Sequence, residues 1–177
     1  MKNRSFRSGV RRLGTQLLCG CPWPLALTGA GVLALGGIAV RSVCGSPYRF
    51  GVMLHFADVL PSVPLMTALW TVWYALLGAT FCIALLGGRQ DACARAEKYR
   101  GGMLFLAMIF LGFLWYPLFF SAGRTVLCAL LLGGVLALCI LTALCWLRVC
   151  RTCGVVMLVH AVYLGWLLAL SVALLFV

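Results

Sequence analysis

Long apolar segments, separated by short polar ones, make up most of this chain. Each has the ~20 residues with which an α-helix crosses a bilayer, and none shows the alternation of a barrel strand. Between the third and fourth segments only "SAGR" is less apolar. A fused helix would be far too long for one crossing, so we expect a turn near Gly123 and Arg124. The five predicted spans are roughly 23–40, 63–86, 102–122, 124–147 and 154–177.

Composition supports an all-α integral membrane protein with a five-transmembrane-helix bundle. The chain has 177 residues, of which 64% are hydrophobic and only 10% charged, which lies outside the range of soluble domains. Five spans leave no room for a separate soluble domain, so we expect one membrane domain over residues 1–177 with a basic tail at 1–18. The apolar run after this tail continues to Val40 without an obvious cleavage site, which favours a retained first span over a signal peptide. A signal anchor is the alternative.

The basic residues lie mainly between the apolar runs, and the net charge is +11. Eleven Lys and Arg fall on one set of alternate sides and three on the other. The positive-inside rule therefore predicts a multi-pass protein of the bacterial cytoplasmic membrane, with its N-terminus in the cytoplasm. Anionic lipid head groups are the expected partners of these clusters, and nucleic acid is not.

The sequence contains few candidate residues for conventional enzyme chemistry. The only acidic residues are Asp58, Asp91 and Glu97, and none lies in a predicted span. There is accordingly no carboxylate pair for acid–base catalysis or proton-coupled transport, and we name no confident catalytic residue. Cys150 and Cys153 form one CxxC pair without a second pair or nearby histidines, so we expect no metal site and no required cofactor.

Aromatic residues recur at helical spacing in three of the spans. Residues three or four apart share a helix face, and these pairs lie inside the spans rather than at their ends, where lipid-facing belts gather. Such faces could line a pocket for a flat apolar ligand, or they could simply fill the core. The pairs are Trp70 with Tyr74, Trp115 with Phe119, and Tyr163 with Trp166.

Four further features bear on packing and access. His160 is the one histidine in a span, and a hydrogen bond to a neighbouring helix is favoured over a proton relay. Small residues such as Ala30 and Gly29 predict close packing of the first span, either within the chain or in a homodimer. The loop at 41–62 is rich in aromatics and is interpreted either as a lid over a ligand or as an interfacial belt. Arg124 could hold helix-end carbonyls or reach lipid head groups.

The stretch "LGFLWYPLFFSAGR" at 111–124 resembles the third-helix signature of the TspO/MBR family, the tryptophan-rich sensory proteins and translocator (peripheral-type benzodiazepine receptor-like) proteins. The similarity includes Trp115, Pro117 and the aromatics that follow them. Two more blocks agree in order and spacing, and the five-span count matches. These blocks are Pro61 followed by Trp70 and Tyr74, and Tyr163 followed by Trp166.

The resemblance implies a five-helix bundle, often dimeric, that binds porphyrins and, in animal members, cholesterol and synthetic drugs. Some members degrade protoporphyrin in light, and Trp70 and Trp166 would then be the reactive tryptophans. The chain departs from the family at Gly112, at Val162 and in the loop before Pro61, and its end lacks the sterol motif of animal members, which disfavours sterol. The expected ligand-binding residues are Trp70, Tyr74, Trp115, Phe119, Tyr163, Trp166 and Pro61.

The leading hypothesis is a membrane receptor or sensor that binds a porphyrin or another tetrapyrrole among these aromatics, for its transport or regulation. His55 and His160 are optional polar partners of that ligand. One alternative is a light-dependent porphyrin-degrading enzyme that uses the same pocket. A second alternative is a structural bundle that acts through protein partners.

Overall fold

A computed structural model describes residues 23–44, 63–87, 91–120 and 124–173 of the chain. Within this part every regular element is an α-helix, and each helix is long and apolar enough to cross a membrane. The all-α class and the five membrane-spanning helices are therefore confirmed. The helices are α2 (Trp23–Cys44), α4 (Val63–Leu86), α5 (Ala92–Phe120), α6 (Thr125–Leu147) and α7 (Arg151–Ala173).

The helix bounds follow the apolar pattern except where a helix continues into polar sequence. The prediction for α4 is confirmed at both ends, and α6 begins one residue later than expected. The expected start of α5 at 102 is wrong, because the helix begins at Ala92. The segment "ACARAEKYR" contains good helix formers such as Ala, Arg, Glu and Lys, which extend a helix past its apolar part. Similarly, α2 runs to Cys44 and α7 begins at Arg151.

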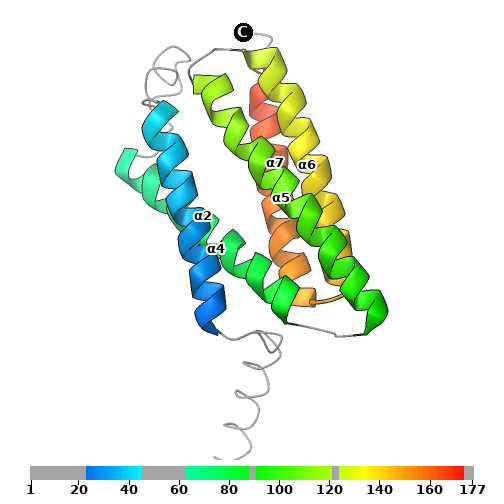
Figure 1. The fold of residues 1–177 in the computed structure, drawn as a ribbon. Helices are drawn as coiled ribbons and strands as arrows, with labels where there is room; N and C mark the ends of the chain where they lie inside the picture. The colour runs from blue at the N-terminus through cyan, green and yellow to red at the C-terminus, as the bar shows by residue number, and fades with distance from the viewer. Residues whose placement is uncertain (1–22, 45–62, 88–90, 121–123, 174–177) are drawn as a thin grey trace, which may run out of the picture.

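The five helices form a closed ring in which α2 contacts α4, α4 contacts α7, α7 contacts α6, α6 contacts α5, and α5 contacts α2 (Figure 1). The contacts are uneven around this ring. Helix α2 packs along α4, and α6 packs along both α5 and α7, whereas α4 meets α5 and α7 at few positions. The bundle thus consists of a helix pair, α2–α4, beside a three-helix unit, α5–α6–α7.

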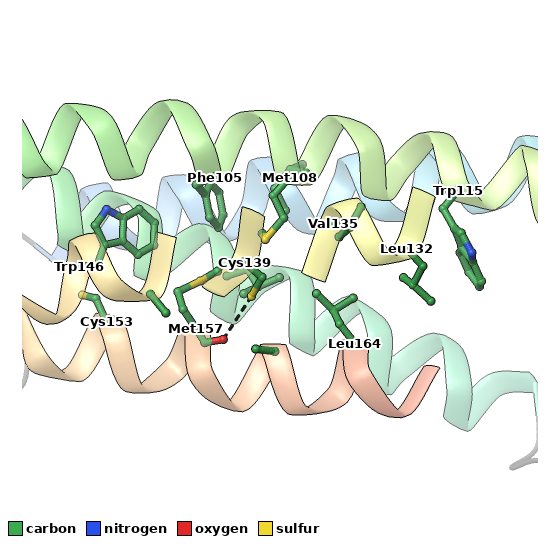
Figure 2. Packing of buried hydrophobic residues seen from close by; sticks show 14 of the residues in the cluster. Phe105, Met108, Trp115, Leu132, Val135, Cys139, Trp146, Cys153, Met157 and Leu164 are labelled. Carbon is green, nitrogen blue, oxygen red and sulfur yellow. Dashed lines mark hydrogen bonds between the residues drawn. The ribbon is translucent and has the colours of Figure 1, made fainter. Parts of the chain in front are cut away.

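The three-helix unit has a dense core (Figure 2). Phe105 of α5, Trp146 of α6 and Met157 of α7 are fully buried. Cys139 is buried with them, and its thiol donates a hydrogen bond to the carbonyl of Met157 at 3.3 Å. Its environment is that of a small packing residue, as expected for a cysteine within a span.

The helix pair is held by a close approach of backbones. A Cβ added to Gly29 or to Gly78 would collide with the backbone of the other residue's helix, and a Cβ on Gly37 would collide with the ring of Tyr74. Small residues permit such approaches between membrane helices. The close packing predicted for the first span is confirmed, and these glycines use it for contact within the chain.

The turn between α5 and α6 lies where the sequence predicts it. Pro117 lies in the last turn of α5, where it cannot donate a hydrogen bond to the preceding turn and the helix ends soon after, at Phe120. The backbone N–H of Arg124 donates to the carbonyl of Leu118 at 3.3 Å, which connects the two helix ends. Arg124 makes this contact through its backbone, and its side chain is exposed.

Candidate ligand-binding site

The helix pair meets the three-helix unit largely through aromatic rings. On the α5 side, Trp70 lies edge-on to Tyr116, with ring centroids 4.9 Å apart at 87°. Tyr74 lies 5.3 Å from the ring of Phe113. We call this boundary the aromatic seam. It consists of Trp70, Trp73 and Tyr74 of α4, Phe113, Trp115, Tyr116 and Phe119 of α5, and His160 and Tyr163 of α7.

Two of the three predicted aromatic pairs come together at the α5 side of the seam. Trp115 is buried and stacks on Phe119, with centroids 4.8 Å apart and an interplanar angle of 18°. Tyr116 joins this pair to Trp70, because it also lies 5.6 Å from the ring of Trp115. Sequence reasoning missed Tyr116, which is adjacent to Trp115 in the chain and so does not appear in a search for residues three or four apart.

The α7 side of the seam contains a buried hydrogen bond. The indole N–H of Trp73 donates to Nδ1 of His160 at 2.8 Å, which confirms the expected hydrogen bond from this histidine to a neighbouring helix. His160 also stacks on Tyr163, with ring centroids 6.2 Å apart. Sequence analysis gave Trp73 no role. Because it lies one residue before Tyr74, its side chain is turned about 100° around α4 from that of Tyr74 and contacts α7 instead of α5.

Trp166 lies at the edge of the α7 group. Its ring is 6.2 Å from that of Tyr163, and 57% of the residue is exposed. In this arrangement Trp166 is therefore not among the buried aromatics. The third predicted pair lies near Trp73 and His160 rather than near Trp115 and Phe119.

A small hollow opens between α2, α4 and α5 at the Trp70 end of the seam. Arg41, Trp70, Tyr74 and Tyr116 border it, and its volume is about 10 Å³. Ligand pockets for drug-sized molecules hold about 300–1,000 Å³. Over the described residues the seam is thus closed by its own rings, and the hollow has room for about one water molecule.

Several predicted features lie outside the described residues. They include Pro61, His55 and most of the 41–62 loop, so the proposed lid stays a prediction. Two positions at which the chain departs from the family are described. A Cβ on Gly112 would meet open space, and Val162 is 75% exposed.

The CxxC pair lies at the start of α7, away from the seam's rings. Cys150 and Cys153 are both buried, with their sulfur atoms 3.1 Å apart. In the part of the chain that the structure describes, no group of three or more His, Cys, Asp or Glu side chains could hold a metal ion.

The family comparison agrees with this architecture. The chain matches the family model of the TspO/MBR family over residues 24–176, which is nearly its whole length. No curated protein and no solved structure matches it. The match includes all five helices and every residue of the aromatic seam. This integral multi-pass membrane protein therefore belongs to the TspO/MBR family.

Proposed function

We propose that the protein is a membrane receptor or sensor that binds a tetrapyrrole, or a similar flat hydrophobic molecule, at the aromatic seam. Family membership points to a membrane sensor or transporter. The choice of ligand rests on one observation, which is that aromatic rings from α4, α5 and α7 contact one another along one boundary. Aromatic rings contact one another by offset stacking or edge to face, and a flat conjugated ligand can make the same contacts.

Binding at the seam requires the helix pair to move relative to the three-helix unit, because the hollow is too small for a macrocycle. The movement exchanges ring–ring contacts for ring–ligand contacts. Each aromatic pair contributes only about 0.5–1.5 kcal/mol beyond its burial, and a ligand can restore that amount. Since α4 meets α5 and α7 at few positions, the seam can open while the core of α5, α6 and α7 stays packed.

The hydrogen bond between Trp73 and His160 supplies the polar groups that such a site uses for orientation. Both side chains lie on the seam, and each would lose its partner if the seam opened. A ligand that offers a hydrogen-bond acceptor to the Trp73 indole, or a donor to His160, would replace that bond. A purely apolar ligand would leave both groups unsatisfied, which is costly in an apolar environment.

We also propose that the N-termini of α5 and α7 face the cytoplasm of a bacterial cell. Of the described residues, five basic ones lie near this end of the bundle and only two near the other, where α2 ends and α6 begins. That asymmetry follows the positive-inside rule. The hollow beside Trp70 would then open on the outer side of the membrane. The residues of the cytoplasmic end are Arg95, Lys98, Arg100, Arg148 and Arg151, and those of the other end are Arg41 and Arg124.

The test is a titration of detergent-purified protein with protoporphyrin IX, in which the affinity is measured from the absorbance change of the porphyrin. Absorbance is preferred because energy transfer can quench tryptophans far from the ligand. We expect saturable binding that weakens in Trp70→Phe and in Trp73→Phe. Trp23→Phe is the matched control, since Trp23 is 64% exposed at the start of α2 and outside the seam.

Binding that does not saturate in wild type would contradict the proposal. Equal affinities in wild type and in both seam variants would also contradict it, because the ligand would then bind elsewhere on the bundle.

An illuminated sample in the same series separates a receptor from a porphyrin-degrading enzyme. A receptor leaves the Soret absorbance unchanged, whereas an enzyme removes it at a rate that depends on the seam tryptophans.

A further inference from the structure

Arg41 places a guanidinium group beside the aromatic seam. The residue lies in the last turn of α2 and borders the hollow together with Trp70, Tyr74 and Tyr116. Its Nη2 atom is buried and has no hydrogen-bond partner. A buried donor without a partner costs free energy, more so when it carries charge. The guanidinium is thus placed to gain from an acceptor that enters the hollow.

The described part of the chain offers Arg41 no carboxylate. The described acidic residues are Asp91 and Glu97, and both lie at the other end of the bundle, near the start of α5. Glu97 accepts a hydrogen bond from Arg148 at 2.7 Å. Near Arg41 the hydroxyl of Thr71 donates to the carbonyl of Thr67 at 2.8 Å, within its own helix.

The surroundings of Arg41 suit an anion attached to an apolar ring. A guanidinium binds a carboxylate through two parallel hydrogen bonds, and such charge-assisted bonds are strong away from water. The hollow of about 10 Å³ has room for about one water molecule, which is the size of a single carboxylate oxygen. The rings of Trp70 and Tyr116, 4.9 Å apart, provide apolar surface directly beside that position.

We propose that Arg41 is the anion anchor of the ligand site, and that it selects flat hydrophobic ligands that carry a carboxylate over neutral ones. The inference rests on the proposed function, because it concerns the same seam and the same ligand class. The carboxylate accepts a hydrogen bond from the unpaired Nη2 of Arg41, and the ring of the ligand replaces the contact between Trp70 and Tyr116. Arg41 is therefore a specificity-determining residue.

The experiment compares protoporphyrin IX with its dimethyl ester, which keeps the macrocycle but replaces both carboxylates by neutral methyl esters. Both are titrated into wild type, Arg41→Gln and Arg41→Lys in a neutral detergent, so that no lipid phosphate competes for the guanidinium. Arg124→Gln is the matched control, because it removes one exposed arginine from the same end of the bundle. Asp58→Asn tests whether the loop carboxylate is the partner of Arg41.

We expect Arg41→Gln to weaken binding of the diacid by about tenfold or more, as for loss of a charge-assisted hydrogen bond, and to leave binding of the ester unchanged. Arg41→Lys should lie between wild type and Arg41→Gln, because lysine keeps the charge but not the two-pronged geometry. Arg124→Gln and Asp58→Asn should bind both probes as wild type does. Unchanged affinity for the ester also shows that Arg41→Gln is folded.

Three results would contradict the proposal that Arg41 is the anion anchor. Arg41→Gln could bind the diacid as tightly as wild type, or it could lose affinity for both probes equally, which would mean a packing role. A marked gain in diacid affinity in Asp58→Asn would show that Asp58 already occupies the guanidinium. In each case saturable binding by wild type leaves the proposed function standing. If wild type binds neither probe, the proposed function itself fails.

Discussion

The core of α5, α6 and α7 and the aromatic seam are both built from large side chains, but they pack differently. In the core, Phe105, Trp146 and Met157 are fully buried in a cluster that comes mainly from α5, α6 and α7, with Phe81 of α4 packed against it. At the seam, Trp70 and Tyr74 are only partly buried, and α4 meets the other helices at few positions. Dispersion contacts accumulate with the number of neighbours. The core is therefore the stable platform, and the seam is the boundary that a ligand can open.

The two regions also differ in polarity. The buried contact of Cys139 with Met157 joins helices that are already densely packed. The hydrogen bond between Trp73 and His160 instead crosses the boundary between the helix pair and the three-helix unit, and Arg41 beside the seam has a buried donor without a partner. Because α4 meets α7 at few positions, these groups can exchange partners, whereas the unpaired indole N–H of Trp146 is enclosed in the core. The contrast assigns stability to one region and recognition to the other.

The largest effect is expected from truncating a core ring. Trp146→Ala removes a fully buried indole and should lower the free energy of unfolding by about 3–5 kcal/mol. Trp70→Ala, at the seam, should cost roughly half of that or less, because its site is already partly open. Denaturant titration in detergent micelles measures both. Equal losses would remove the distinction between core and seam.

The variant Trp146→Phe tests whether the ring volume or the indole N–H of this residue stabilises the core. The indole Nε1 of Trp146 is buried without a hydrogen-bond partner. Replacing an unsatisfied buried donor by an apolar group of similar shape costs little. We expect a loss below about 1 kcal/mol, which would show that the core depends on ring volume rather than on the indole N–H.

The next effect concerns the close approach of α2 to α4. A methyl group on Gly78 would collide with the backbone of Gly29, so Gly78→Ala should destabilise the protein by about 1–3 kcal/mol. Gly134→Ala is the control, because its added methyl meets open space on α6 and alanine favours the helix by up to about 1 kcal/mol. Thermal unfolding compares the two. A tolerated Gly78→Ala would contradict the tight helix pair.

A smaller effect is expected from the hydrogen bond across the seam. Trp73→Phe, His160→Leu and the double variant form a cycle whose coupling measures the 2.8 Å bond between these side chains. Hydrogen bonds between membrane helices couple by about 0.5–1.5 kcal/mol. A coupling of zero would mean that the seam is held by ring packing alone.

The smallest effect is expected at the ion pair of the opposite end. Arg148 donates to Glu97 at 2.7 Å, and the side chains are 71% and 15% exposed, respectively. Because the arginine lies largely in water, screening reduces the contribution of the pair. Arg148→Gln should leave the melting temperature within measurement error. A clear drop would show that this end, rather than the core, limits stability.

Much of the fold could be predicted from hydropathy, because apolar runs of sufficient length must form membrane helices. The bounds of α4 and the turn before Arg124 follow from that pattern alone. The start of α5 at Ala92 does not follow from hydropathy, because a helix can continue into charged residues that lie outside the apolar run. Nor could the pattern show that Gly29 meets Gly78, because pairing between helices depends on three-dimensional packing.

The candidate site was less predictable than the fold. Spacing found Trp70 with Tyr74 and Trp115 with Phe119, since residues on one face recur every three or four positions. It could not show that Tyr116 joins these pairs or that Trp73 faces His160, because these contacts cross between helices. Spacing could not predict which aromatic side chains are buried either, since Trp166 is 57% exposed.

The most direct test of the seam is ¹⁹F NMR of protein labelled with 5-fluorotryptophan. The six tryptophans give six signals, which single Trp→Phe variants assign. On titration with protoporphyrin IX, ring currents should shift Trp70, Trp73 and Trp115 most. Trp23, at the start of α2, should stay in place, and Trp146, whose ring lies 6.4 Å from that of Phe81 of α4, should shift less than the seam tryptophans. A shift of Trp146 as large as those of the seam tryptophans would contradict an opening confined to the seam.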